Sequence, residues 1–300
     1  MSGTSERIRK NFAETDEKRD AGLTTPETVI RYDDISYGPD PVWQVLDVYR
    51  PKAAEKKRLP IIVSVHGGGW VYGDKERYQF YCMSLAEQGF AVVNFSYRLA
   101  PEHKFPAALE DTCMVFTWVF EKALRYGLDT ENIFAVGDSA GGHTLALFCA
   151  MCTNPDYQKR FPFSPPKDFV PSAIALNSGI YMVTVSDKPE DKFSTDLMSD
   201  YLENKNSTEE LLLVNPIEWM NGKFPPTFLM TAEGDFLKHQ VPAVASKLID
   251  ENVAFSAHYY KDTGMELGHV FHLNIRLPKA QRCNEEECTF FKKYMKTGTE

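Results

Sequence analysis

Long apolar runs and dense clusters of basic residues are both absent from this sequence of 300 residues. No window reaches the roughly 18 apolar residues that a membrane span needs. The net charge of −9 argues against a nucleic-acid-binding surface. The first thirty residues are polar and charged, without the apolar core of a secretory signal. We therefore expect no membrane partner, no nucleic-acid partner and no export by the usual route.

Cysteine is also scarce, and the six cysteines are scattered rather than spaced as a disulfide framework. Cys149 and Cys152 form a Cys-x-x-Cys motif, but it lies inside an apolar stretch that is predicted to be a helix. A metal or redox site would need an exposed turn and partner ligands, so we interpret both residues as buried thiols. The sequence thus predicts a reducing, cytoplasmic location.

Short apolar segments alternate with longer helical patterns along most of the chain, and no internal repeat is present. Strands are predicted at 28–37, 44–49, 60–65, 90–97, 132–136, 172–176, 226–232 and 254–260, and helices at 78–88, 107–126, 140–152, 240–252 and 279–294. The first two strands are close together and partly polar, which suggests an antiparallel edge. The alternation predicts an α/β fold with a mostly parallel central sheet and helices on both faces.

Two segments do not follow this alternation. Residues 1–25 are dense in charge and could form one or two helices, and residues 180–222 form a polar insertion with short helix candidates at 196–203 and 208–214. An insertion of this length after a strand is more often functional than not. We expect one α/β domain over 1–300, with residues 180–222 forming a lid over the site and residues 1–25 forming either a tail or a small lid piece.

Ser139 lies in a Gly-x-Ser-x-Gly motif between a predicted strand and a predicted helix. This spacing is typical of a nucleophile elbow, a tight turn that projects a serine hydroxyl above the sheet. Glycines on either side remove the Cβ atoms that would collide in the turn. The free N–H groups of the following helix favour a developing negative charge nearby. An ordinary strand-to-helix turn is the alternative interpretation.

Three successive glycines follow the strand at 60–65, in the segment His-Gly-Gly-Gly-Trp at 66–70. Glycine lets backbone N–H groups approach a ligand closely, and the carboxyl end of a parallel strand is where ligands usually bind. We expect an oxyanion hole here rather than a merely flexible turn.

A serine nucleophile needs a base, and the base needs an orienting acid. Asp235 follows the strand at 226–232, with Glu233 as a rival acid. His269 follows a glycine in the loop after the last strand, with His272 as its competitor. The order Ser139, Asp235, His269 along the chain is that of α/β-hydrolases.

Four motifs together resemble the hormone-sensitive-lipase-like family of bacterial esterases, a group of α/β-hydrolases. They are His-Gly-Gly-Gly at 66–69, Tyr-Arg-Leu-Ala-Pro-Glu at 97–102, Phe-Pro-Ala-Ala-Leu-Glu-Asp at 105–111 and Gly-Asp-Ser-Ala-Gly-Gly at 137–142. The resemblance runs from about residue 46 to residue 291. It implies Ser139 as nucleophile, His269 as base and Asp235 as the residue that orients it, and an oxyanion hole formed by the N–H groups of Gly67, Gly68 and Ala140.

The same resemblance implies a serine carboxylesterase that acts on short acyl chains through an acyl-enzyme, without metal or cofactor, and a possible homodimer. It also implies a small cap formed by residues 1–25 and 180–222. A departure from the family is His143, where asparagine is common. Trp70, Asp138, Tyr181 and Phe236 are candidate substrate contacts, although the three aromatic residues could instead be core side chains, which is the commoner case. An amidase or peptidase on the same scaffold and a non-catalytic binding protein are the alternatives.

Overall fold

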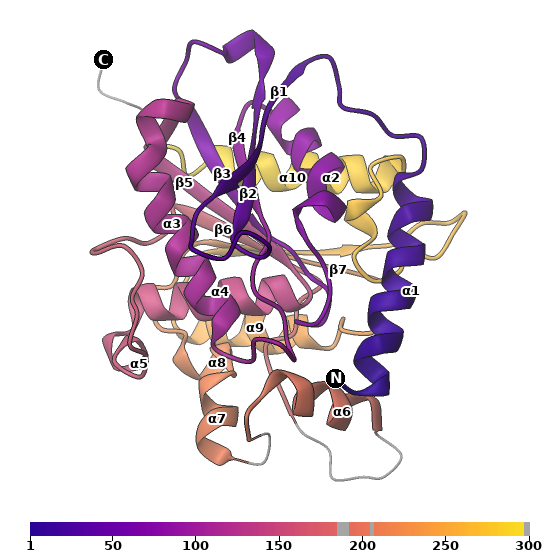
Figure 1. The fold of residues 1–300 in the computed structure, drawn as a ribbon, viewed down its shortest axis with the longest axis vertical. Helices are drawn as coiled ribbons and strands as arrows, with labels where there is room; N and C mark the ends of the chain where they lie inside the picture. The colour runs from indigo at the N-terminus through magenta and orange to yellow at the C-terminus, as the bar shows by residue number, and fades with distance from the viewer. Residues whose placement is uncertain (185–191, 205–206, 297–300) are drawn as a thin grey trace.

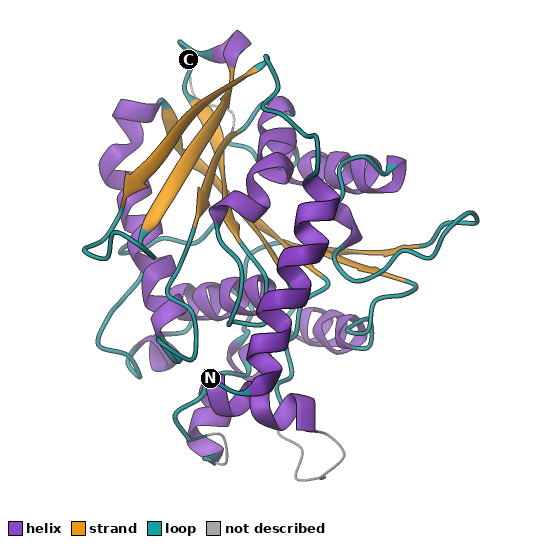
Figure 2. Ribbon diagram, turned by 45° about the vertical axis from the view of Figure 1, so that its right-hand side comes forward, coloured by secondary structure: helices purple, strands orange, loops and turns teal. Residues whose placement is uncertain are grey.

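The computed structural model describes residues 1–184, 192–204 and 207–296. Its centre is a twisted eight-stranded sheet with the strand order β1-β2-β4-β3-β5-β6-β7-β8 (Figure 2). The strands are β1 (Val29–Ser36), β2 (Val45–Pro51), β3 (Leu59–Val65), β4 (Ala91–Phe95), β5 (Leu128–Asp138), β6 (Ala173–Asn177), β7 (Thr227–Ala232) and β8 (Phe255–Tyr260).

Parallel pairing dominates this sheet. β1 pairs antiparallel with β2, and β2 pairs antiparallel with β4, whereas every pairing from β4 through β3 to β8 is parallel. The central strands are buried on both faces, which matches their near-continuous apolar sequences. The predicted mostly parallel α/β sheet with an antiparallel edge is confirmed, although β5 begins four residues before the predicted strand because Leu128 already pairs with Leu59.

Helices cover both faces of the sheet, as predicted (Figure 1). α2 (Lys75–Glu87) and α10 (Pro278–Lys292) pack on one face, and α3 (Ala107–Tyr126), α4 (Ala140–Thr153) and α9 (Gln240–Asp250) pack on the other. A short helix, α5 (Pro155–Gln158), follows α4. Two apolar cores therefore fill the spaces above and below the sheet, and they hold the strand ends at fixed positions.

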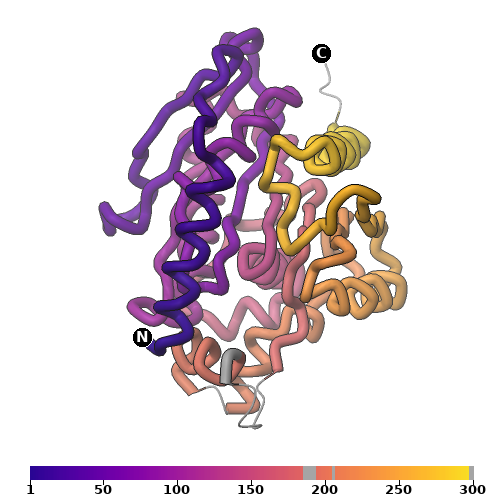
Figure 3. Tube along the Cα trace, turned by 90° about the vertical axis from the view of Figure 1, so that its right-hand side faces the viewer, coloured from indigo at the N-terminus to yellow at the C-terminus, as the bar shows by residue number. Residues whose placement is uncertain are grey.

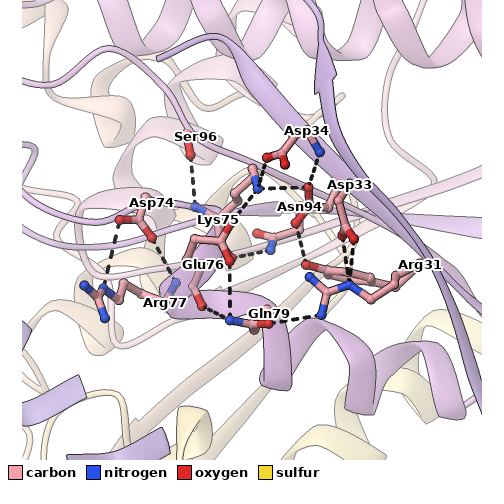
Figure 4. A network of polar contacts seen from close by, with 12 residues as sticks. Arg31, Asp33, Asp34, Asp74, Lys75, Glu76, Arg77, Gln79, Asn94 and Ser96 are labelled. Carbon is pink, nitrogen blue, oxygen red and sulfur yellow. Dashed lines mark hydrogen bonds and ion pairs between the residues drawn. The ribbon is translucent and has the colours of Figure 1, made fainter. Parts of the chain in front are cut away.

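The start of α2 is held by a network of charged side chains (Figure 4). The Nζ atom of Lys75, whose side chain is 4% exposed, lies 2.8 Å from Asp34 Oδ1 and 3.0 Å from Asp47 Oδ1. The backbone of Lys75 is also bonded, because its N–H donates to Ser96 Oγ and its carbonyl accepts from Asn94 Nδ2. A buried ammonium is tolerated when carboxylates pair with it in this way. The first turn of α2 is thus tied to β1, β2 and β4.

The two segments predicted to form a cap lie next to each other. Residues 1–25 contain one helix, α1 (Gly3–Asp20), and the insertion contains α6 (Lys192–Tyr201), α7 (Thr208–Leu213) and a four-residue helix that was not predicted, α8 (Pro216–Trp219). Residues 185–191 and 205–206 of the insertion lie outside the described residues. Figure 3 shows α1 running along the molecule with its N-terminal end beside the segment that contains α6.

Side-chain hydrogen bonds fix α1 at both ends. Near its start, Thr4 Oγ1 donates to Asp196 in α6 at 2.9 Å. At its middle, Arg9 donates to the carbonyls of Val71 and Ala100, and at its end Arg276 donates to the carbonyl of Arg19. The hydrophilic helix is therefore held largely by polar contacts. In the part of the chain that the structure describes, no helix has the length and apolar character of a membrane span.

Candidate active site

Ser139 occupies the sharp turn between β5 and α4. Its backbone has φ 50° and ψ −121°, a strained conformation for a residue with a side chain. The glycines explain how the turn closes: a Cβ on Gly137 would lie 2.6 Å from the carbonyl oxygen of Gly141, and one on Gly141 would lie 2.1 Å from that of Val65. The Ser139 N–H donates to the Asn177 carbonyl at 3.0 Å. The turn is a nucleophile elbow in its geometry.

The structure brings Ser139, His269 and Asp235 into one hydrogen-bonded chain. Nε2 of His269 lies 3.0 Å from Ser139 Oγ, and its Nδ1 lies 2.8 Å from Asp235 Oδ1. An ionised carboxylate only accepts hydrogen bonds, so Nδ1 carries a proton and Nε2 is the atom that can accept one from the serine. This arrangement can activate a serine hydroxyl.

Asp235 is held as a carboxylate by its surroundings. Burial alone would raise its pKa, but the hydrogen bond and charge of His269, the Leu237 N–H at 2.9 Å and the Thr231 hydroxyl at 2.7 Å together lower the pKa below its usual value. The residue is 1% exposed. It therefore remains ionised at neutral pH and can orient the imidazole.

The loops that carry Asp235 and His269 are joined by backbone contacts. The Gly234 N–H donates to the Leu267 carbonyl at 3.0 Å, and Gly234 and Gly268 form an isolated parallel bridge. This bridge continues the alignment of β7 and β8 past the strand ends. The ring of Phe236 then covers the imidazole of His269, with 4.3 Å between ring centres.

The rival residues lie elsewhere. Glu233 accepts the N–H of Asp262 at 3.1 Å rather than contacting His269. His272 is fully buried, and burial lowers its pKa to about 3, which keeps it neutral. Of the two alternatives at each position, the structure thus places His269 beside Ser139 and Asp235 beside His269.

One of the three predicted oxyanion-hole donors, the N–H of Gly67, already has a hydrogen-bond partner in the structure. The N–H of Gly67 donates to the hydroxyl of Tyr78 at 2.8 Å, so it is directed at a side chain rather than at a ligand. Among the hydrogen bonds of the described residues, none engages the N–H of Gly68 or of Ala140. Ala140 is the first residue of α4, where the helix dipole also favours an anion. These two predicted donors remain available.

A cavity of about 230 Å³ opens onto Ser139 and His269. It is lined by Phe12, Thr15, Asp16, Arg19, Gly67, Gly68, Tyr72, Tyr78, Asp138, Ser139, Phe236, His269, Val270 and Leu273. Four of these residues come from α1, so the N-terminal helix forms one wall. The predicted contacts Asp138 and Phe236 are in this lining. Sequence reasoning missed Asp16 and Arg19, which carry no motif and enter the cavity only through the docking of α1.

Trp70 and Tyr181, also predicted to contact substrate, do not line the cavity. Both are buried in the apolar core. Trp70 stacks on Tyr201 at 4.3 Å and donates its Nε1–H to His143 Nδ1 at 3.1 Å. Both are large aromatic side chains that pack between the glycine-rich loop, α4 and the insertion. Their closeness to the site along the sequence did not distinguish core packing from substrate binding.

The described residues do not form a cluster of metal-binding side chains. Across the described residues, no group of three or more His, Cys, Asp or Glu side chains is arranged to hold a metal ion. All six cysteines are free, and Cys149 and Cys152 lie in α4, the first buried and the second half-buried. Asp138 is a buried acid at the cavity wall, and burial raises its pKa to about 7.

Residues 46–253 match the model of the family described as BD-FAE. Esterase LipQ of Mycobacterium tuberculosis is 29% identical over 231 residues, which cover 75% of this chain and 51% of LipQ. The chain spans only 32% to 58% of the length of the first three curated relatives that it matches.

Solved esterase structures cover almost the whole chain. Esterase B from Lactobacillus rhamnosis superimposes with a TM-score of 0.86 at 26% identity, over 98% of this chain and 97% of that one. An esterase from Pyrobaculum calidifontis gives a TM-score of 0.78 at 26% identity, over 98% and 93%. With its elbow, its glycine-rich loop and its sheet, the chain belongs to the BD-FAE family and, within the α/β-hydrolases, to the hormone-sensitive-lipase-like esterases.

Proposed function

We propose that the protein is a serine carboxylesterase that hydrolyses short-chain acyl esters through an acyl-enzyme. The observation that carries the proposal is the hydrogen-bonded chain from Asp235 through His269 to Ser139, with separations of 2.8 and 3.0 Å, beside a cavity that Ser139 and His269 line. A hydroxyl, a base and an orienting carboxylate in this order are what acyl transfer requires.

The residues of the site have distinct tasks in the proposed reaction. His269 Nε2 takes the proton of Ser139 as Oγ attacks the ester carbonyl, and Asp235 stabilises the imidazolium that forms. The N–H groups of Gly68 and Ala140 stabilise the negative oxygen of the tetrahedral intermediate. His269 then protonates the leaving alcohol, and a water molecule repeats these steps to release the acid and restore Ser139.

The size of the cavity supports a small substrate. Its volume of about 230 Å³ is below the roughly 300–1,000 Å³ typical of sites for drug-sized ligands. Esterase B from Lactobacillus rhamnosis, which resembles this chain, has been described with a C4-C4 tributyrin phosphonate. Short acyl chains of similar length are therefore the proposed substrates here.

The test is hydrolysis of p-nitrophenyl esters from acetate to dodecanoate, measured beside the matching anilides and with Ser139→Ala as control. A maximum at acetate to butyrate that Ser139→Ala abolishes is the expected result. Cleavage of anilides in preference to esters would replace the proposal by an amidase. A folded protein that is inactive on both series would favour a binding function.

The cap, the location and the oligomeric state belong to the same proposal. α1 and the segment with α6 to α8 act as a small cap on a single domain, supported by the cavity wall that α1 provides. The free state of all six cysteines supports a reducing, cytoplasmic location. We expect a homodimer, and light scattering after size-exclusion chromatography would measure the molar mass that tests this expectation.

A further inference from the structure

Tyr78 bridges the two loops that would form the oxyanion hole. Its hydroxyl accepts the Gly67 N–H at 2.8 Å and lies 2.8 Å from Oδ2 of Asp138. Gly67 immediately precedes the donor Gly68, and Asp138 immediately precedes Ser139. The tyrosine is 6% exposed, and its hydroxyl lies between the glycine-rich loop and the elbow.

The direction of these hydrogen bonds follows from the two groups that Tyr78 contacts, the Gly67 N–H and the Asp138 carboxyl. A backbone N–H can only donate, so the Tyr78 oxygen accepts from Gly67 and its own proton is directed to the Asp138 carboxyl. Hydrogen bonds in such a chain polarise and strengthen one another, more so where water is excluded. The chain therefore fixes the orientation of the Gly67 peptide plane.

The two loops are in direct backbone contact, so a small displacement of one affects the other. A Cβ on Gly67 would lie 2.6 Å from Asp138 Oδ2 and 2.9 Å from its carbonyl oxygen, and one on Gly141 would lie 2.4 Å from the His66 carbonyl oxygen. This close approach leaves room for glycine alone. Tyr78 supplies the hydrogen bond that holds the approach together.

The backbone that carries Tyr78 is itself rigidly held. Tyr78 follows Lys75 by three residues, in the turn of α2 that the network of Figure 4 ties to β1, β2 and β4. Asp74 caps this turn by accepting the Arg77 N–H at 3.0 Å. The Tyr78 side chain therefore extends from a helix whose first turn is held in place, rather than from a loop.

We propose that Tyr78, together with Asp138, is a positioning residue that sets the geometry of the oxyanion hole. The role rests on the proposed esterase function. Because the Gly67 N–H is bound to Tyr78, the peptide is turned so that the next N–H, that of Gly68, is directed to the reacting oxygen beside Ala140. Tyr78 itself does not touch the reacting atoms. Its loss misplaces a donor that acts mainly in the transition state.

The test compares Tyr78→Phe with wild type on p-nitrophenyl butyrate. Removal of one oxyanion donor costs about 10²–10³-fold in kcat, so misplacing one is expected to lower kcat by about 10- to 100-fold and to change KM by less than about twofold. The Ki of butylboronic acid, which forms a tetrahedral adduct with the serine, should rise in parallel, whereas inhibition by butyrate should not change.

Tyr37→Phe is the matched control, because it also removes a buried tyrosine hydroxyl with a backbone partner, the Ser96 carbonyl at 2.7 Å. Tyr37 is not in the lining of the cavity. Both variants should lose some thermal stability, but only Tyr78→Phe should lose kcat. A Tyr78→Phe variant with kcat within twofold of wild type would overturn the positioning role.

Two further outcomes are distinguishable. A wild-type protein inactive on all esters would overturn the proposed function and this role with it, whereas an active wild type with an unaffected Tyr78→Phe variant overturns this role alone. If Tyr78→Phe does not fold, Asp138→Asn tests the other end of the chain. A severalfold lower kcat at unchanged KM is expected, and an unchanged kcat would overturn the proposal. If both fold, the double variant should lose little more than Tyr78→Phe.

Discussion

The indole Nε1–H of Trp70 donates to Nδ1 of His143 across 3.1 Å, inside the protein core. The other ring nitrogen, Nε2, lies 2.7 Å from the carbonyl oxygen of Val214. Since an indole only donates and a carbonyl only accepts, the imidazole is neutral, with its proton on Nε2. One histidine thus connects the glycine-rich loop, the elbow helix α4 and the insertion after β6.

This arrangement predicts acid sensitivity. Burial lowers the pKa of His143 to about 4 from 6.5, so its contribution to stability is complete above pH 6.5 and is lost as pH falls through 4. This lowering of the pKa corresponds to a loss of about 3 kcal/mol in the free energy of unfolding. His143→Asn, which has no group titrating there, should be less stable than wild type at pH 7 and should lose less of its unfolding free energy between pH 7 and pH 4.

Urea denaturation at several pH values measures this effect. His239→Asn is the control, because His239 is exposed. A wild type and a His143→Asn variant with parallel pH profiles would contradict the prediction.

Asp235→Asn should reduce kcat by about 10³–10⁴-fold, because the amide cannot hold His269 in the required tautomer or stabilise its imidazolium. Glu233→Gln is the matched control, as it changes the other acid of the same loop, which contacts the Asp262 backbone. It should keep kcat within about twofold. A larger loss in Glu233→Gln than in Asp235→Asn would reverse the assignment of the orienting acid. Steady-state kinetics on p-nitrophenyl butyrate decides between them.

Glu287 gives a pH dependence of the opposite sign. Burial raises the pKa of this fully buried carboxyl to about 7, despite hydrogen bonds from Asn177 at 2.6 Å and Tyr81 at 3.0 Å that lower it. The folded protein therefore favours the protonated acid, and stability falls as pH rises from about 4.5 to 7.

Glu287→Gln should remove this fall in the free energy of unfolding, which corresponds to roughly 3 kcal/mol. Relative to wild type, the variant should therefore be more stable at pH 8 than at pH 5. The unfolding free energies of the two proteins at pH 5 and pH 8 provide the measurement. Glu285→Gln on the same helix, where the side chain is exposed, is the control. An equal change with pH in wild type and Glu287→Gln would show that Glu287 does not titrate in this range.

Asp16 should influence the charge of the substrates that are accepted. Its carboxylate lies in the cavity wall and accepts from Tyr72 at 2.8 Å and from Arg19 at 2.9 Å. Removing one negative charge should favour an anionic substrate by about 1 kcal/mol, or about fivefold. We expect Asp16→Asn to raise kcat/KM for p-nitrophenyl hemisuccinate relative to p-nitrophenyl butyrate by this factor.

Asp20→Asn is the matched control for Asp16→Asn. Asp20 also pairs with Arg19, at 2.7 Å, but it is not in the cavity lining. The ratio of kcat/KM for p-nitrophenyl hemisuccinate to kcat/KM for p-nitrophenyl butyrate should change less than twofold in this variant. Equal changes in both variants would indicate that Asp16 acts only through Arg19 and not on the substrate.

The sequence alone determined the order of strands and helices and the place of the site at the strand ends. Apolar runs such as 60–65 and 226–232 became buried parallel strands, because a segment apolar on both sides must be covered on both faces. The elbow at Ser139 was also visible, since Gly137 is required by a contact within the turn, with the Gly141 carbonyl oxygen. The chain order of Ser139, Asp235 and His269 follows from the same local motifs.

Only the tertiary structure decided which groups point at one another. The Gly67 N–H is bound by Tyr78, eleven residues away on another element, and Trp70 faces His143 rather than the cavity. Asp16 and Arg19 reach the cavity because contacts with α6 and Arg276 dock α1 against it. Such directions depend on side-chain pairings between segments far apart in the chain, and local residue patterns carry no information about them.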